Sequence, residues 1–181
     1  MFGSAVKWRR HPKDRLDRLA QAIEAIAGRD QRLIDENAVV DQLRLRGAAS
    51  LYQLCRAFVD NLNGRLTQPA LVLDPPEWTD ESFDDARPNL LQISLRGRLL
   101  QLEYAATEEA YSTEDFRQRY VLRGGVRSFN QNFLEHNTVD EQQIFYCPGE
   151  TGAEWHFFDV RTYRTGILTV DYLAAELERL L

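Results

Sequence analysis

The strongest constraint on the fold is an alternating stretch, NLLQISLRGRLLQLEY, at residues 89–104. Apolar residues alternate with others on both sides of Arg96 and Gly97, a dipeptide suited to a two-residue hairpin turn. With the turn placed there, Leu95 faces Arg98, and every pair further from the turn is fixed. The predicted apolar pairs are Ile93 with Leu100 and Leu91 with Leu102. The stretch therefore predicts an antiparallel hairpin with one apolar and one polar face.

Two further stretches favour hairpins. In YVLRGGVRSFNQNFL the turn is predicted at Gly124 and Gly125, which places Tyr120 opposite Phe129. The other stretch is YCPGETGAEWHFFDV, at residues 146–160. An even-numbered connection there places Cys147 opposite Glu154, so that Cys147 and His156 share one face of the sheet. An odd-numbered connection places them on opposite faces.

Helical periodicity occupies the N-terminal third of the chain. A first amphipathic helix is predicted from Pro12 to Gly28, and a weaker second helix ends at Gly47. A third helix is capped by Ser50 and ends at Gly64. The apolar stripe of the first helix, which we expect to help hold the fold, consists of Leu16, Leu19, Ala20, Ile23, Ile26 and Ala27. On the third helix, Cys55 lies on the stripe that faces the core.

A last amphipathic helix is predicted within residues 169–181, where Thr169 can cap it. Helices followed by strands and a final helix indicate an α+β protein. We expect an N-terminal helical segment, an antiparallel sheet of about 5–7 strands built from hairpins, and the C-terminal helix packed on one face of that sheet. The 181 residues suit a single domain, with 1–66 as a candidate helical subdomain and 67–181 as the sheet with its helix.

The charge is unevenly distributed. Residues 1–18 hold six Lys or Arg and two Asp, a local charge of +4, and the net charge of −6 leaves −10 for the rest of the chain. Such an acidic body repels phosphate backbones, so no nucleic-acid partner is expected. No apolar run is long enough to span a membrane, and two cysteines do not make a disulfide framework. These features favour a cytoplasmic protein.

Cys147 and His156 are the only weak catalytic candidates. A diagonal placement on one sheet face would let the thiol and the imidazole meet. The stretch supplies neither a cation to lower the pKa of the thiol nor a third residue to orient the imidazole. We therefore interpret the segment as an aromatic hairpin that packs in the core, and the chain as a protein that leans away from catalysis. No metal site and no cofactor are predicted, because the spacings that define them are missing.

The candidates for binding form two groups. Weak ligand-binding candidates are Arg123, Arg127 and His136. The string RGGVR that joins the two arginines lacks the spacing of a phosphate loop and is interpreted as a turn. The weak candidates for partner binding are Trp8, Arg9, Arg10 and Trp78. Trp78 lies in the acidic segment 74–86, which carries six carboxylates and no Lys or Arg.

Two hypotheses on function follow. The leading one is a non-catalytic binding or adaptor domain for an unknown protein partner. It includes self-association, in which the basic arm of one copy docks on the acidic segment of another. The alternative is a small-molecule-binding or hydrolytic protein with its site in a cupped antiparallel sheet. An enzyme needs ionisable side chains that converge in a pocket, whereas an adaptor needs an exposed apolar or charged surface.

Overall fold

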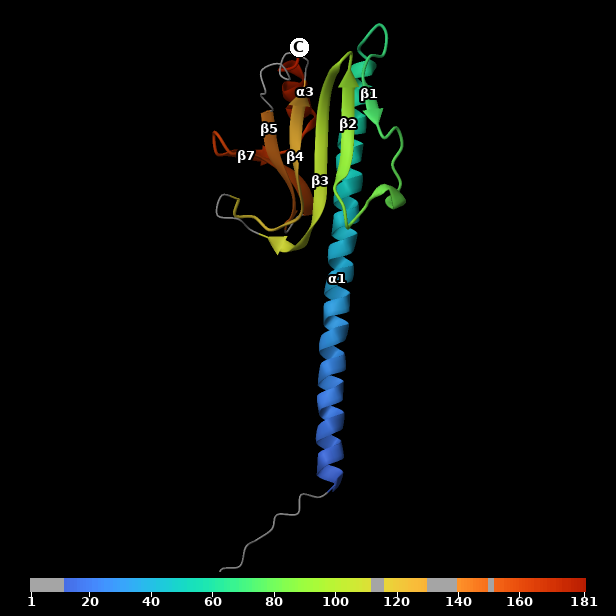
Figure 1. The fold of residues 1–181 in the computed structure, drawn as a ribbon, viewed down its shortest axis with the longest axis vertical. Coiled ribbons are helices and arrows are strands. Elements are labelled where there is room, and N and C mark those ends of the chain that lie inside the picture. Colours follow the sequence, from blue (N-terminus) through green and yellow to red (C-terminus); the bar gives the residue numbers. More distant parts are fainter. Residues whose placement is uncertain (1–11, 112–115, 130–139, 150–151) are drawn as a thin grey trace, which may run out of the picture. The chain divides into compact units, whose positions relative to one another are not determined.

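The structure, a computed structural model, describes residues 12–111, 116–129, 140–149 and 152–181 (Figure 1). The chain divides into two compact units, Met1–Val40 and Asp41–Leu181. Helix α1, Pro12–Asn63, contributes to both units, and the sheet belongs to the second. The single domain with a helical subdomain at 1–66 stays a prediction.

The protein is an α+β protein, as its sequence predicts. Helix α1 is followed by a seven-stranded antiparallel sheet whose strands neighbour one another in chain order, and helix α3 ends the chain. The strands are β1 Val72–Asp74, β2 Asn89–Leu95, β3 Arg98–Tyr111, β4 Tyr120–Phe129, β5 Asp140–Gly149, β6 Gly152–Asp159 and β7 Arg164–Ile167. A short 3-10 helix, η1 Asp80–Ser82, precedes β2, and α3 is Val170–Glu178.

The hairpin between β2 and β3 has the predicted register. Leu95 pairs with Arg98, and the apolar pairs further out are those expected from the alternation. Both turn residues have positive φ, 45° at Arg96 and 83° at Gly97, which is the geometry of a type I′ turn. Ile93 and Leu100 are completely buried. The local twist of the turn and the burial of one face thus select the same register.

The N-terminal helical segment is one helix and not three, so the predicted breaks at Gly28 and Gly47 are wrong. A glycine inside a helix costs only about 1 kcal/mol relative to alanine, which is too little to end a long helix. Gly47 instead allows close packing, since a Cβ there would lie 2.6 Å from the Tyr146 ring. Ser50 does not cap a helix start, because its hydroxyl donates to the Gly47 carbonyl within the helix at 2.8 Å.

The turn predicted at Gly124 and Gly125 is also wrong. Both glycines lie inside β4, so Tyr120 and Phe129 are the two ends of one strand rather than a cross-strand pair. Gly124 pairs with Tyr104 of β3 on one side and Ile144 of β5 on the other. A central strand can hold glycine where neighbouring groups approach closely, and that requirement overrides the turn preference of the dipeptide.

Within the second unit, one sheet face packs against helices. The indole N–H of Trp155 donates to the Gly47 carbonyl of α1 at 2.8 Å. Phe157 lies two residues further along β6, on the same face, and stacks on Tyr172 of α3 with ring centroids 4.7 Å apart. Cys55 is fully buried in this core, as predicted. The segment 41–63 of α1 and the C-terminal helix therefore cover one face of the sheet.

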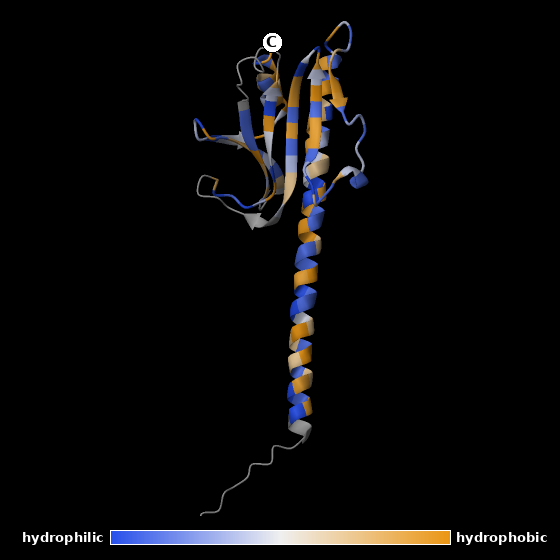
Figure 2. Ribbon diagram, in the orientation of Figure 1, coloured by the Kyte–Doolittle hydropathy of each residue, from blue (hydrophilic) through white to orange (hydrophobic). Residues whose placement is uncertain are grey.

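The first unit contradicts the expectation that its apolar stripe holds the fold. Every described side chain from Arg15 to Val39 is exposed. Figure 2 shows apolar bands recurring along this part of α1, and those side chains are not buried. Periodicity alone indicates that a face is suited to burial, but it does not say what buries it.

Candidate functional site

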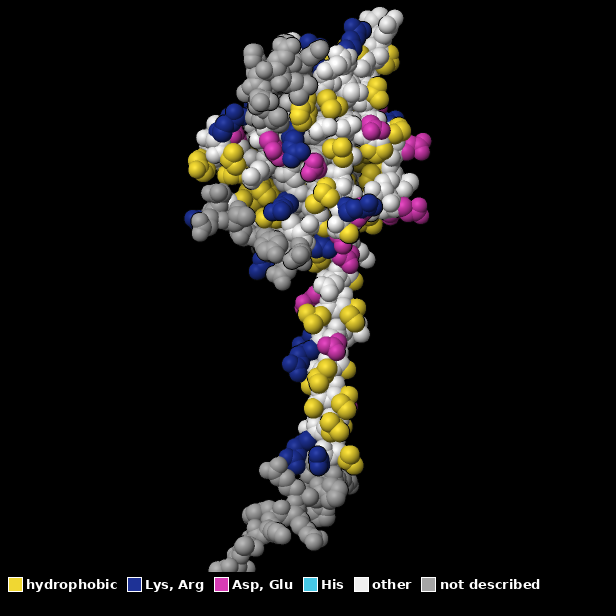
Figure 3. Space-filling model, viewed as in Figure 1, with side chains coloured by type: hydrophobic (Ala, Val, Ile, Leu, Met, Phe, Trp, Pro, Cys, Tyr) yellow, Lys and Arg dark blue, Asp and Glu magenta, His cyan; other side chains and the backbone are white. Residues whose placement is uncertain are grey.

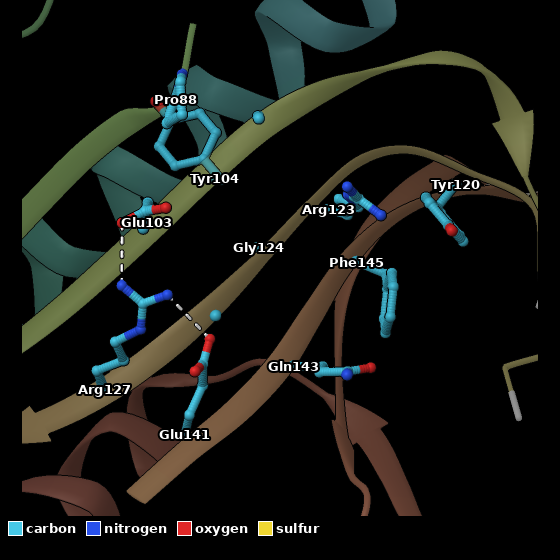
Figure 4. A pocket seen from close by; sticks show the side chains of 12 residues that line it. Pro88, Glu103, Tyr104, Tyr120, Arg123, Gly124, Arg127, Glu141, Gln143 and Phe145 are labelled. Atoms are coloured by element: carbon cyan, nitrogen blue, oxygen red, sulfur yellow. Dashed lines mark hydrogen bonds and ion pairs between the residues drawn. The ribbon is translucent and has the colours of Figure 1, made fainter. Parts of the chain in front are cut away.

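A groove of about 480 Å³ lies on the sheet face opposite Trp155, across strands β3, β4 and β5 (Figure 4). The register explains the location, because Arg123, Gly125 and Arg127 alternate along β4 with the buried residues Leu122 and Val126. The groove is lined by Pro88, Glu103, Tyr104, Ala105, Tyr120, Arg123, Gly124, Gly125, Arg127, Glu141, Gln143 and Phe145. It brings together two of the three predicted ligand-binding residues, Arg123 and Arg127.

One end of the groove is a closed charge network. Arg127 forms ion pairs with Glu103 of β3 at 3.0 Å and with Glu141 of β5 at 3.2 Å. The pKa of the Arg127 guanidinium is raised above its usual value, chiefly because its hydrogen bond to Glu141 favours the charged form. With two carboxylates against one guanidinium, this end offers no net positive charge to a ligand.

Arg123 has a different environment. It faces Ala105 of β3 and Phe145 of β5 across the strands, and its side chain is exposed. Among the described residues no carboxylate forms an ion pair with Arg123. Figure 4 shows Arg123 near Tyr120 and Phe145, away from the network around Arg127. The groove therefore presents one uncompensated guanidinium beside aromatic rings.

Those rings form the apolar end of the site. Phe145 stacks on Phe116 with ring centroids 4.3 Å apart, and Tyr120 lies 4.7 Å from Phe145. Cys147 and Phe158 complete the buried cluster. Because the rings pack on one another, this end of the groove is a firm apolar wall rather than a set of mobile side chains.

The two glycines of β4 form the groove floor. A Cβ at Gly125 would lie 2.6 Å from the Glu141 carboxylate oxygen, in the space that Glu141 occupies when it reaches Arg127. A Cβ at Gly124 would collide with the Glu103 backbone carbonyl. The missing side chain of Gly125 thus leaves room in the groove, and that of Gly124 lets β3 and β4 approach closely.

Cys147 and His156 share one sheet face in the predicted register, with Cys147 opposite Glu154 and Phe145 opposite His156. The thiol is nevertheless buried, and it donates to the Phe145 carbonyl at 3.8 Å. Burial raises its pKa to about 12, so it is protonated at neutral pH. A nucleophilic thiol needs the opposite shift.

The remaining binding candidates are described only in part. The ligand-binding candidate His136 and the partner-binding candidates Trp8, Arg9 and Arg10 lie outside the described residues. Trp78 lines a second hollow of about 280 Å³ next to Tyr104, and its ring is stacked with Tyr52 of α1 at a centroid distance of 6.4 Å. Its ring is therefore already engaged within its own chain.

The acidic segment 74–86 has fewer unpaired carboxylates than its sequence indicates. Asp84 pairs with Arg87 just outside the segment at 2.6 Å. Asp85 pairs with Arg44 of α1 at 3.3 Å, and the buried Arg44 also donates to the Thr107 carbonyl. Two of the six carboxylates thus hold the segment in place.

The groove could not be foreseen from the sequence, although one signal pointed to it. In RGGVR, two arginines four positions apart on a strand lie on the same face, and the glycines between them remove side chains from the sheet. When the same string is interpreted as a turn, the two arginines are no longer expected on one face of a strand. Only the register of β4 between β3 and β5 brings Glu103 and Glu141 to Arg127 and leaves Arg123 without them.

Within the part of the chain that the structure describes, no three His, Cys, Asp or Glu side chains gather as a metal site would require. Its helices include none with the length and hydrophobicity needed to cross a membrane. No protein family, no curated protein and no solved structure matches the chain. The function is therefore argued from the geometry of the groove.

Proposed function

We propose that the protein is a non-catalytic binding or adaptor protein, and that its groove binds an acidic, extended segment of a protein partner. The observation that carries the proposal is the exposed guanidinium of Arg123 beside an aromatic wall. A guanidinium binds a carboxylate with two parallel hydrogen bonds when none of its own carboxylates competes. Arg127 is engaged by Glu103 and Glu141, so Arg123 is the group that selects the ligand.

The shape of the groove favours an extended ligand. It crosses three neighbouring strands, with Tyr120 and Phe145 at one end and the Arg127 network at the other. A segment with an apolar side chain next to Asp or Glu matches the first end. Its backbone amides or polar side chains match the second, where Gln143 and the two glutamates offer acceptors. The proposed partner motif is therefore a carboxylate adjacent to an aromatic or aliphatic residue.

The binding role is non-catalytic in this proposal because Cys147, which packs in the aromatic cluster behind the groove, is held as a thiol. Two buried, unpaired cysteines and an acidic body support a cytoplasmic location, which belongs to the same proposal. A small organic acid is the second candidate ligand, because about 480 Å³ falls within the range of small-molecule sites. The hydrolytic version of that alternative has less support, because the described residues that line the groove include no Cys, Ser, Thr or His.

A display library of random linear peptides tests the proposal. The immobilised full chain should enrich peptides that carry Asp or Glu next to an apolar residue. An enriched peptide should bind the Arg123→Gln variant at least tenfold more weakly in a fluorescence titration. Arg164→Gln is the matched control, since Arg164 is an exposed arginine of β7 that does not line the groove.

The outcomes separate the candidates. Enrichment of acidic peptides that need Arg123 but not Arg164 supports the adaptor function. Enrichment without an acidic signature, or equal binding to both variants, contradicts it. Failure of the library combined with Arg123-dependent binding of N-acetyl-phenylalanine, whose carboxylate and ring match the same end of the groove, favours the small organic acid.

A further inference from the structure

The unit Met1–Val40 carries an exposed apolar row along α1. Its members recur at alternating spacings of three and four residues, the a and d positions of a heptad repeat. The row consists of Leu16, 65% exposed, Leu19, 55%, Ile23, 57%, Ile26, 52%, and Leu33, 58%. Figure 3 shows hydrophobic side chains along the surface of this part of the helix. An uncovered row of this kind marks a surface that associates with another chain.

The opposite face of the same helix is suited to solvent exposure. The f positions of the heptad, farthest from the row, are Gln21, Gly28 and Asp35, and a Cβ at Gly28 would meet nothing within 4 Å. Polar residues also dominate the neighbouring b positions, which are Asp17, Glu24 and Gln31. Ile34, 60% exposed, lies at an e position and widens the row at one end. An a/d row with polar residues or glycine at b and f is the pattern of a coiled-coil seam rather than of a helix buried on several sides.

We propose that this row is the seam of an antiparallel coiled coil between two copies of the chain. The inference is independent of the groove, because every residue it uses lies in the first unit. We assign a second copy of the chain as the partner of this row. The apolar row, the charges beside it and its small residues are complementary to those of a second copy in one antiparallel register.

Charge excludes a parallel pairing. The a position between Ile26 and Leu33 is Asp30. In a parallel dimer Asp30 would face Asp30 of the second copy inside the seam, where two like charges without a partner are strongly unfavourable. An antiparallel dimer avoids this contact, since a residues then lie in layers with d residues and Asp30 is opposite an apolar neighbour.

Charge also selects the antiparallel register. When Leu16 lies in a layer with Leu33 of the second copy, the g residues pair Arg15 with Glu36 on both ends of the seam. A shift of one heptad in either direction instead brings Arg29 beside Arg29, or Arg15 beside Arg29. Among the g positions, opposite charges therefore meet in only one of the three registers.

The other edge of the seam fits the same register. The e residues Ala20 and Ala27 then pair with each other across the dimer, and their small side chains allow the helices to approach closely. The overlap from Arg15 to Glu36 amounts to about three heptads, or roughly 33 Å of helix at 1.5 Å per residue. That length is near the lower limit for a stable two-stranded coiled coil, and Asp30 in the seam weakens it further, so the dimer should be reversible.

Sedimentation equilibrium of the full chain tests the seam. The wild-type chain should form a dimer, and Ile26→Glu should weaken it at least tenfold, because it places a charge in a d position. Ala25→Glu is the matched control, since it adds the same charge one residue away on the outer face. Unchanged tryptophan fluorescence, to which the buried Trp155 contributes, would show that the second unit stays folded in both variants. A wild-type chain that is monomeric at every concentration, or equal effects of both variants, would overturn the proposal.

A charge swap tests the register. Arg15→Glu should raise the dimer Kd at least fivefold, Glu36→Arg should do the same, and the double variant should restore the wild-type Kd. Arg15 and Glu36 are about 31 Å apart along one helix, so they can couple only between copies. Additive losses in the double variant would overturn the antiparallel register, even if the Ile26→Glu result supported a dimer.

Discussion

Glycine has opposite roles at two positions of this chain. Gly28 lies on the outer face of α1 with open space around it, whereas Gly124 lies in β4 where a Cβ would collide with the backbone of Glu103 and lie 2.9 Å from the Tyr104 Cα. Gly28→Ala should raise helix stability by up to about 1 kcal/mol through propensity alone. Gly124→Ala should cost about 1–3 kcal/mol, because two paired strands must move apart.

Far-UV circular dichroism during heating measures the first change, and urea unfolding followed by tryptophan fluorescence measures the second. The two variants add the same methyl group, so each is the control for the other. An unchanged urea midpoint for Gly124→Ala would contradict the close approach of β3 and β4.

Buried thiols should give the protein a stability limit at high pH. Burial raises the pKa of Cys55 and of Cys147 from 9.0 to about 12, so the folded state holds both protons more tightly than the unfolded state. The resulting stability is present below pH 9 and is lost as the pH rises toward 12. The free energy of unfolding should fall by at most about 1.4 kcal/mol per pH unit for each thiol.

Urea titrations between about pH 8 and pH 11 measure this slope. Cys147→Ala should make the slope smaller, whatever the variant does to stability at neutral pH. A thiol-reactive reagent should also modify Cys147 of the wild-type chain no faster than an ordinary cysteine. A steeper slope in the variant, or a fast-reacting thiol, would show that Cys147 ionises easily and would reopen its catalytic interpretation.

At the scale of the element, the contribution of the β2–β3 hairpin to core stability can be tested one residue at a time. Ile93 is completely buried, and its pair Leu100 is too. Ile93→Ala should cost roughly 2–5 kcal/mol in urea unfolding, since it leaves a cavity between close-packed neighbours. Gln92→Ala, next along the strand but on the other face, should change stability by less than about 0.5 kcal/mol. Equal effects of both substitutions would contradict the register.

The same hairpin shows which parts of the fold a sequence can predict. Its register depends on a turn and on alternation within sixteen residues or so, and both are local signals. The helix breaks predicted at Gly28 and Gly47 failed because a glycine is a small penalty that the rest of a long helix easily offsets. The turn predicted at Gly124 is wrong because the glycine is needed where β3 approaches closely, and β3 is distant in the sequence.

The candidate site was predictable only as a set of residue types. Arg123 and Arg127 could be named from the sequence, but their roles differ because β3 and β5 supply carboxylates at the level of Arg127 alone. Likewise, the stripe from Leu16 to Ile26 was found by its period, and its exposure was not. A periodic apolar face indicates that the face is suited to burial. Only the fold shows that the described residues of the same chain do not cover it.

At the scale of the whole molecule, the two proposals describe an adaptor with one groove in each copy of a dimer. Such a dimer engages two acidic segments at once, so a partner with repeated motifs would bind more tightly than a single peptide. The seam and the groove share no residue, so substitutions in one should leave the affinity of the other for its own ligand unchanged.

Salt separates the two proposed sources of self-association. The apolar seam should persist when salt rises from 0.1 to 1 M, because screening shortens the Debye length from about 10 to 3 Å without weakening apolar contacts. Docking of the basic arm on the acidic segment should instead weaken with salt, and deletion of residues 1–11 should remove that salt-sensitive part. Only four carboxylates of the segment, Asp74, Glu77, Asp80 and Glu81, are left for the arm after Asp84 and Asp85 pair with arginines. We therefore expect sedimentation to show a dimer that survives 1 M salt and the truncation with a modestly higher Kd. Complete dissociation under either condition would assign the dimer to the arm and contradict the seam.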